Sequence, residues 1–441
     1  MKFYGREKEI LELRKVREIS HRFARFTVVT GRRRIGKTQL VRQAFDDKTD
    51  PYLHLVITKK TEKVQCQKLQ EQSVRVLGMT IHGTCEHFSA LFEELMKESV
   101  VRPFTLILDE FQEFDKVDPS IFGEVAGIWD AYHNRSKVNL VVCGSVNRLM
   151  NKIFFDDSEP LYGRNTGRLH LDPFKVSVLK EILGDFHPNY TADDLLSLWT
   201  ITGGVARYVE LLMESGAFTR EDMIKTVFGG ITAFIDEGRM ILSEEFGKEY
   251  GTYFTILSSI ASGKTSFAEI SNEVGMDVGG YLTRLETLYG LVVKKQPVHE
   301  RSRNKNCLYQ IDDCFFRFWF RFVVGYQEYV ELRRMEELRE IVRRDFSQFS
   351  GYALERYFYW KFVEETHYVR MGGWWDRKGE NEIDLVCEDD EKGALDIYEI
   401  KREKCRISPK SLERKVAAFF EKNPDLKTRN VRCLALSLED M

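Results

Sequence analysis

Long apolar runs are absent from this sequence, and this absence bears on where the protein works. No run of about 18 apolar residues occurs in the 441-residue chain, so the sequence offers no candidate for a membrane-spanning helix. The N-terminal segment Met1–Arg6 also lacks the apolar centre of a signal peptide. We therefore expect a cytoplasmic protein without a membrane partner.

Paired cysteines, linker-forming prolines and an excess of one charge are also missing. The eight cysteines are scattered and form no CxxC pair, and we interpret them as free buried thiols of a reducing cytoplasm. The nine prolines mark no linker, and the chain has no internal repeat or low-complexity segment. The formal net charge is only −3, so bulk charge predicts no polyanionic partner, although a local basic patch could bind one.

The first part of the chain, up to about residue 172, alternates apolar runs with amphipathic segments. The apolar runs, which we expect to be buried strands, are residues 23–30, 52–57, 104–108 and 138–143. Helical patterns cover residues 37–45, 63–77 and 84–98. This alternation predicts a parallel sheet with helices on both faces.

The remaining residues follow a different pattern. Residues 192–258 are mostly helical, and residues 265–311 fit a helix, a turn, a second helix and a two-stranded ribbon. Residues 312–345 are aromatic-rich and then strongly charged, and we expect them to be helical. The last hundred residues return to mixed α/β, and the chain is long enough for two to four domains.

A glycine-containing loop follows the first predicted strand and opens a predicted helix. It fits the pattern GxxxxGK[ST] with Gly31, Arg32, Arg33, Arg34, Ile35, Gly36, Lys37 and Thr38, and Gln39 follows. In such a loop the main-chain N–H groups surround phosphates, and the helix N-terminus adds a positive field. We expect ATP to bind at Gly31, Arg34, Ile35, Gly36, Lys37, Thr38 and Gln39. Lys37 would reach the β- and γ-phosphates, and Thr38 would ligate Mg²⁺.

A second Gly-Lys-Thr triplet, Gly263 to Thr265, does not qualify. The first glycine of the pattern would fall on Ser258, which lies inside a helical segment with no strand before it. We therefore expect a single phosphate-binding loop.

Two acids follow the apolar run 104–108. Asp109 is expected to hold Mg²⁺ through water, and Glu110 to polarise the water that attacks the γ-phosphate. Surface acids often follow strands, but beside a phosphate-binding loop this pair matches the second half of an ATPase site.

These motifs, with the N-terminal segment Phe3–Glu7, resemble the archaeal-type ATPase family of the AAA+/STAND-like branch of P-loop ATPases. The resemblance covers most of the chain and implies that Ser145 lies near the γ-phosphate as a sensor. It implies that Arg164 could be an arginine finger, supplied by a neighbouring subunit or a folded-back domain. It also implies that Arg207 is a second sensor, although the family's proline is Ala206 here. The alternative for each arginine is a structural salt bridge.

The segment 265–311 fits a helix-turn-helix with a basic wing. The wing tip, between the two ribbon strands, holds His299, Arg301, Arg303 and Lys305. A basic tip could contact DNA phosphates. The alternative is a packing lid whose charged hairpin is simply solvated.

Acidic and basic residues near the C-terminus look like the PD-(D/E)XK nuclease pattern. Asp384 lies in one predicted strand, and Glu399 and Lys401 alternate by two on the next, so the latter two share a face. Asp384 and Glu399 would hold Mg²⁺, while Lys401 would stabilise charge or orient a water. Glu355, on a helix upstream, matches the extra helical acid that such nucleases often carry. The alternative is a degenerate nuclease fold kept as a docking module.

Together these features predict an α/β protein with an AAA+-like P-loop domain and a C-terminal restriction-endonuclease-like domain. The expected boundaries are 1–175 for the ATPase core, 176–245 for a helical lid, 246–312 for the winged helix and 313–441 for the nuclease-like domain. We expect ATP hydrolysis linked to nucleic acid, with metal-dependent nuclease activity, and a homo-oligomer if Arg164 acts in a neighbour. The alternative is a STAND-like switch in which ATP controls association and the C-terminal domain binds a partner without chemistry.

Overall fold

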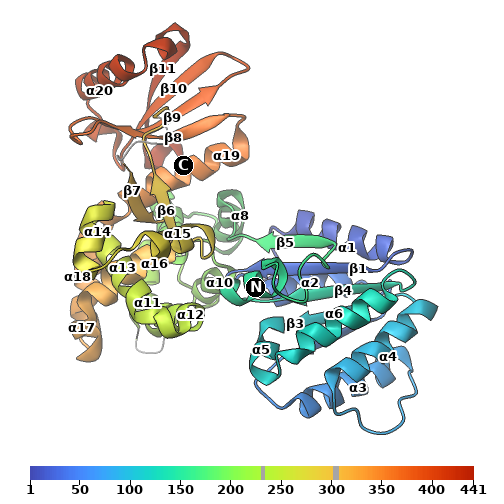
Figure 1. Cartoon of the computed structure of the whole chain (residues 1–441). Helices are drawn as coiled ribbons and strands as arrows, with labels where there is room; N and C mark the ends of the chain where they lie inside the picture. Colours follow the sequence, from blue (N-terminus) through green and yellow to red (C-terminus); the bar gives the residue numbers. More distant parts are fainter. Residues whose placement is uncertain (230–233, 301–306) are drawn as a thin grey trace. The chain divides into compact units, whose positions relative to one another are not determined.

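The chain folds into two units, and the computed structural model describes residues 1–229, 234–300 and 307–441 (Figure 1). The N-terminal unit comprises Phe3–Pro173, and the C-terminal unit comprises Phe174–Met441 with Met1 and Lys2. Within the described ranges, no helix combines the length and apolar character that crossing a bilayer requires.

The N-terminal unit is built on a five-stranded sheet in which every pair of neighbours is parallel. The strand order is β2-β3-β4-β1-β5, with bounds β1 Arg25–Gly31, β2 Tyr52–Val56, β3 Phe104–Asp109, β4 Val138–Cys143 and β5 Gly167–Leu171. The predicted parallel sheet is therefore confirmed. The edge strand β5 was not expected, because its exposed residues alternate with partly buried ones and leave no apolar run.

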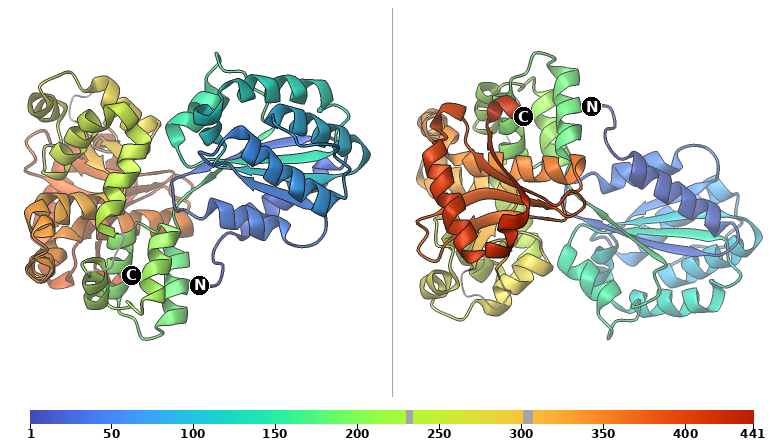
Figure 2. Two further views of the ribbon diagram at one scale, coloured as in Figure 1. Left: turned by 90° about the horizontal axis from the view of Figure 1, so that it is seen from below. Right: turned by 90° about the horizontal axis from the view of Figure 1, so that it is seen from above.

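Helices cover both faces of this sheet (Figure 2). Their bounds are α1 Glu7–Ser20, α2 Lys37–Phe45, α3 Glu62–Leu77, α4 Phe88–Val101, α5 Phe114–Val117, α6 Ser120–Tyr132 and α7 Asn147–Phe155. Phe26 and Val28 of β1 belong to a large core cluster on one face. Val29 alternates with them, faces the other side and is also fully buried. A sheet buried on both faces explains why its central strands read as continuous apolar runs.

The C-terminal unit begins with helices. Their bounds are α8 Val176–Phe186, α9 Ala192–Thr202, α10 Ala206–Glu214, α11 Arg220–Val227, α12 Phe234–Phe246 and α13 Tyr250–Ala261. The expected order of helix, turn, helix and ribbon follows as α14 Phe267–Val274, α15 Gly279–Thr287, β6 Val292–Lys295 and β7 Leu308–Ile311. β6 and β7 are antiparallel. Of the residues expected at the basic tip, Arg301, Arg303 and Lys305 lie outside the described residues.

His299, which we expected at the exposed tip, is instead buried against the C-terminal sheet. Its side chain is 9% exposed, and Arg370 donates to its Nδ1 at 3.0 Å. The preceding Val298 is part of the C-terminal core, and its N–H donates to Gly373 O at 2.9 Å. The prediction was wrong for His299 because the polar pattern of a hairpin does not reveal a neighbouring sheet.

The last part of the unit contains four helices and then a four-stranded sheet, which α19 and α20 contact. The helices before the sheet are α16 Cys314–Phe322, α17 Gln327–Glu331, α18 Met335–Phe349 and α19 Gly351–Glu365. The sheet order is β11-β10-β9-β8, from β8 Arg370–Trp375, β9 Glu382–Asp389, β10 Ala394–Ile400 and β11 Asn430–Leu436. β8 and β10 each run antiparallel to β9, and α20 Pro409–Lys422 leads to β11, which runs parallel to β10.

Candidate functional site

The loop between β1 and α2 has a backbone that only particular residues allow. Gly31 has φ +145°, and a Cβ at this position would lie 2.7 Å from Leu171 O. Gly36, directly before α2, has φ +98°, and Arg34 has φ +66°. Two of these three residues are glycine, which adopts positive φ without a steric cost. The sequence therefore closes a tight loop at the N-terminus of α2.

Lys37, the first residue of α2, is held over this loop. Its Nζ donates to Gly31 O at 2.8 Å and to Arg32 O at 3.0 Å. Among the other residues expected to bind ATP, Ile35 is buried and Gln39 is exposed on α2. The ammonium group thus lies inside the loop where phosphate oxygens would bind.

Thr38 and Asp109 come together from two elements. The Thr38 hydroxyl donates to Asp109 Oδ2 at 2.5 Å, although 71 residues separate them. Asp109 ends β3, and only 2% of its side chain is exposed. Burial alone would raise the pKa of Asp109, but the nearby His54 ring and the hydrogen bond from Thr38 outweigh it, and the pKa lies below its ordinary value. Asp109 is therefore an ionised carboxylate beside the loop.

Glu110 adopts a left-handed backbone, with φ +54°. Its Oε2 accepts from Ser145 Oγ at 2.8 Å and from Gln112 Nε2 at 2.5 Å. Gly144, before Ser145, leaves room for this contact, because a Cβ there would lie 2.6 Å from Gln112 Oε1. The structure thus brings Glu110 and Ser145 together and adds Gln112, while their roles toward a nucleotide stay predictions.

His54 and Gln112 are site residues that the sequence did not suggest. His54 Nε2 lies 3.7 Å from Asp109 Oδ2, and its Nδ1 accepts from Arg42 Nε at 3.2 Å. The sequence held a clue only for Gln112, because it lies two residues after the predicted site residue Glu110. His54 could be predicted as a site residue only by knowing that β2 pairs with β3.

The two arginines expected to act on phosphate both have carboxylate partners. Arg164 makes a forked contact with Asp130 of α6, with Nε and Nη2 distances of 3.1 Å and 2.7 Å to Oδ2. Arg207, on α10 of the C-terminal unit, pairs with Glu210 at 2.6 Å. In this structure both arginines form salt bridges, which is the alternative we stated for each.

A second polar cluster lies in the C-terminal sheet. Lys401 Nζ is 2.9 Å from Asp384 Oδ2 on β9 and 3.3 Å from Glu399 Oε1 on β10. The backbone N–H of Ile400 also donates to Asp384 Oδ2, at 2.6 Å. Lys415 of α20 contacts both Glu399 oxygens, at 2.7 Å and 2.8 Å. The three residues predicted to cooperate therefore do meet, with an additional lysine.

Glu355 of α19 belongs to the same cluster electrostatically. Burial, with the charge of Asp384, raises the pKa of Glu355 to about 8. Burial also raises the pKa of Asp384. Lys295 of β6 lies with its Nζ 4.5 Å from the centre of the Tyr352 ring, one turn before Glu355, and burial lowers its pKa to about 8. The ribbon and the sheet thus both contribute charge to this cluster.

Oxygen donors are present at both sites, but only in small sets. Within the described ranges, no three His, Cys, Asp or Glu side chains are placed to hold a metal ion. Mg²⁺ in nucleotide sites is commonly held by one or two protein oxygens, substrate phosphates and water. Thr38 with Asp109 fits this chemistry, and so do Asp384 and Glu399 as a carboxylate pair.

Two family models match the chain. Residues 3–212 match one described as an ATPase domain predominantly from Archaea, and residues 319–415 match one described as archaeal and bacterial proteins of unknown function. An uncharacterized protein of Methanocaldococcus jannaschii is 28% identical over 410 residues, which cover 90% of this chain and 87% of that protein.

Two solved structures share the fold. The Walker-type ATPase of Pyrococcus abyssi has a TM-score of 0.52 and 17% identity, covering 72% of this chain and 96% of its own. The ORC2 protein of Aeropyrum pernix, solved as ADPNP–ADP complexes, has a TM-score of 0.50 and 14% identity, covering 74% and 96%. Residues 3–212 are therefore similar to ATPase domains found predominantly in archaea, and the geometry of the loop Gly31–Thr38 agrees with that similarity.

Proposed function

We propose that this protein binds ATP with Mg²⁺ at the loop Gly31–Thr38 and hydrolyses it, and that ATP turnover controls the C-terminal unit's action on nucleic acid. The observation that carries the ATPase proposal is the 2.5 Å contact between Thr38 and Asp109. It brings the two halves of a phosphoryl-transfer site together across the sheet.

The residues divide the work of hydrolysis. Lys37 would exchange the carbonyls of Gly31 and Arg32 for phosphate oxygens, while Thr38 and Asp109 would hold Mg²⁺, which supplies neutralising charge. Glu110 would orient the attacking water. Because Ser145 and Gln112 both donate to its Oε2, the Glu110 carboxylate is held in one orientation before substrate arrives.

Arg164 and Arg207 could take part in hydrolysis only after leaving their present carboxylate partners. Arg164 would have to leave Asp130, and Arg207 would have to leave Glu210, before either could contact a phosphate. Arg164 is more than one-quarter exposed, so the arrival of a second subunit could trigger its exchange. We propose a finger role for Arg164 and a sensor role for Arg207 on this condition.

A Glu110→Gln variant tests the hydrolytic role. Glutamine keeps the shape and can still accept from Ser145, but it is a far weaker base, so kcat should fall about 100-fold or more. ATP affinity should change by less than about threefold, because the proposed role of Glu110 is to orient water and not to bind the phosphates. Steady-state phosphate release and equilibrium binding measure the two quantities. Unchanged kcat would remove Glu110 from the mechanism.

The C-terminal cluster supports two candidate functions. The convergence of Asp384, Glu399 and Lys401 on neighbouring strands favours metal-dependent cleavage of a phosphodiester. The contact of Glu399 with both Lys415 and Lys401 favours a docking module instead, because the carboxylate is already neutralised. We propose the nuclease first, since Asp384, Glu399 and Lys401 lie next to one another.

Asp384→Asn separates these candidates. Wild-type protein with Mg²⁺ or Mn²⁺ should cleave DNA or RNA from a panel of duplex, branched and single-stranded substrates, and the variant should lose at least about 100-fold of that rate. Lys404→Gln, which removes an exposed lysine on the turn after β10, is the control. If no substrate is cut by the wild type with either metal, the docking function replaces the nuclease.

A further inference from the structure

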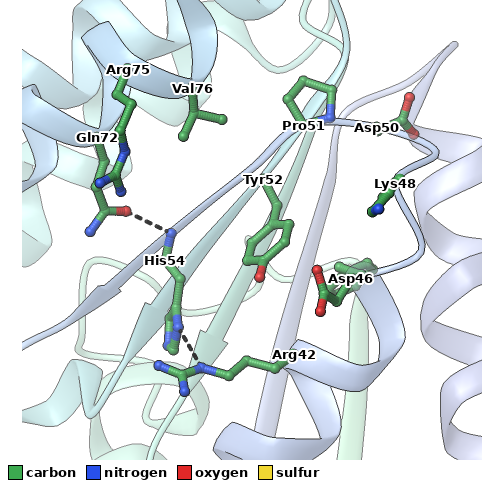
Figure 3. Close-up of a pocket in the computed structure, with 11 residues that line it drawn as sticks. Arg42, Asp46, Lys48, Asp50, Pro51, Tyr52, His54, Gln72, Arg75 and Val76 are labelled. Atoms are coloured by element: carbon green, nitrogen blue, oxygen red, sulfur yellow. Dashed lines mark hydrogen bonds between the residues drawn. The ribbon is translucent and has the colours of Figure 1, made fainter.

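His54 lies between an open cavity and the carboxylate of Asp109. The cavity has a volume of about 650 Å³ and is lined by residues of α2, β2 and α3, including Arg42, Tyr52, Gln72 and Arg75. Figure 3 shows the Arg42 guanidinium beside the His54 ring, where Arg42 Nε donates to Nδ1. On its other side the ring approaches the ATPase site.

Strand pairing places the two side chains on one face of the sheet. β2 and β3 are parallel, and His54 is opposite Ile107, two residues before Asp109. Side chains two residues apart on a strand leave the same face. His54 Nε2 is consequently 3.7 Å from Asp109 Oδ2, the same oxygen that accepts from Thr38.

Arg42 determines which ring nitrogen of His54 carries the proton. The Arg42 Nε donates to His54 Nδ1 at 3.2 Å, and a guanidinium has no acceptor. Nδ1 must therefore be unprotonated, and a neutral imidazole then carries its proton on Nε2. The N–H group of the ring points toward Asp109.

The direction of the His54 N–H group affects stability because both His54 and Asp109 are buried. Only 8% of the His54 side chain and 2% of the Asp109 side chain are exposed. Among the described residues, His54 Nε2 has no hydrogen-bond partner within normal distance. A buried N–H group without an acceptor is unfavourable, so a shift that shortens the 3.7 Å separation from Asp109 would be favoured.

We propose that His54 is a positioning residue of the ATPase site: its Nε2–H group orients Asp109, and Arg42 fixes the tautomer that makes this possible. The inference rests on the proposed ATPase function. It adds an outer layer of two residues to the Thr38 and Asp109 pair, of the kind that orients the ligands of metal sites. A residue that merely filled space would be replaced without loss by an apolar side chain of similar size.

The experiment compares four variants of the full-length protein. His54→Leu removes the N–H group, and His54→Gln keeps an amide N–H donor near the position of Nε2. Arg42→Met removes the donor to Nδ1 but keeps a long apolar stem. His82→Leu, in an exposed loop of the same unit, is the matched control.

The first measurement is the tautomer of His54, from long-range ¹H–¹⁵N spectra of histidine-labelled protein, with the signal assigned by its absence in His54→Gln. We expect a protonated Nε2 and an unprotonated Nδ1 in the wild type, and mixed tautomers in Arg42→Met. A proton on Nδ1 in the wild type would overturn the proposal. This readout needs neither nucleotide nor turnover.

The second measurement is Mn²⁺ affinity in the presence of ADP, followed by electron paramagnetic resonance, together with kcat and KM for ATP. In His54→Leu we expect Mn²⁺ binding and kcat to weaken about tenfold, with KM for ATP changed by less than about twofold. His54→Gln should recover both to within about threefold of the wild type. Equal loss in His54→Gln and His54→Leu, or none in either, would overturn the positioning role.

The experiment distinguishes failure of the ATPase proposal from failure of the proposed role of His54. A wild-type protein that neither binds nor hydrolyses ATP would end the ATPase proposal, while the tautomer spectrum would still decide whether Arg42 sets the proton position on His54.

Discussion

Asp109 and Glu110 are neighbours in sequence with different surroundings. Asp109 is almost fully buried and shares its Oδ2 with Thr38, while Glu110 adopts φ +54° and is held by Ser145 and Gln112. A left-handed backbone at a residue other than glycine costs on the order of 1 kcal/mol and is common at functional sites. The two carboxylates can therefore take different roles, one toward the metal and one toward water.

Arg17 and Asp47 give this unit a pH-dependent contribution to stability. Both Arg17 terminal nitrogens contact the Asp47 carboxylate, at 2.7 Å and 2.8 Å, and the Arg17 side chain is only 6% exposed. The hydrogen bonds from Arg17 hold the pKa of Asp47 well below its usual value of 3.8. Because the folded pKa is lowered, the stabilisation is complete above that value and is lost as the pH falls below it.

We predict that Arg17→Met lowers the free energy of unfolding by about 2 kcal/mol at pH 7, and by progressively less as the pH falls below about 4. Urea unfolding of wild type and variant at several pH values measures the difference. Lys63→Met, which removes an exposed ion pair with Glu86, should leave the free energy of unfolding nearly unchanged at any pH. A difference between wild type and Arg17→Met that stays constant down to about pH 2 would contradict the assignment.

At the scale of elements, the junction of β1 and α2 depends on Gly31. Its φ is +145°, and a Cβ at this position would lie only 2.7 Å from Leu171 O, so there is no room for alanine. We predict that Gly31→Ala destabilises the N-terminal unit by about 2–3 kcal/mol and weakens ATP binding. Thermal unfolding with and without nucleotide measures both effects.

Gly127 provides the matched control for this substitution. It lies within α6, is exposed, and a Cβ there would meet nothing within 4 Å. Gly127→Ala should therefore stabilise the unit by about 0.5–1 kcal/mol. If both alanine variants behaved alike, the steric account of the Gly31 loop would be wrong.

The sequence predicted those strands and helices whose residue pattern lies within a single continuous segment. The central strands are buried on both faces and read as apolar runs, and α2 begins at Lys37 because Gly36 ends the loop with a positive φ. The edge strand β5 could not be found in this way, since two of its five residues are exposed and one, Leu171, is buried. Arg168 and His170 interrupt its apolar residues, so the strand contains no apolar run.

Contacts within the candidate sites could be predicted from the sequence only where the alternation of side chains along a strand determines them. Glu399 and Lys401 share a face by alternation, so their meeting with Asp384 followed once β9 and β10 were expected to pair. Lys415 and Lys295 reach the cluster from α20 and β6, and His54 reaches Asp109 from β2. These contacts depend on which distant elements pack together, and one sequence without its fold does not contain that information.

At the scale of the whole molecule, the two candidate sites lie in different units. The phosphate-binding loop lies in Phe3–Pro173, and the carboxylate and lysine cluster lies in the larger unit. The second Gly-Lys-Thr triplet, Gly263 to Thr265, lies between helices α13 and α14, where Lys264 pairs with Glu273. No strand precedes it, so the molecule should carry one nucleotide per chain.

Calorimetric titration of ATP with Mg²⁺ into the full-length protein tests this central claim most directly. The wild type and Lys264→Ala should each bind one ATP per chain, because only the first loop is built for phosphate. Lys37→Ala should lose at least about 100-fold in affinity while its circular dichroism spectrum stays unchanged, since the variant lacks the ammonium group that meets the phosphates. ATP binding of wild-type affinity in Lys37→Ala, or its loss in Lys264→Ala, would contradict the account.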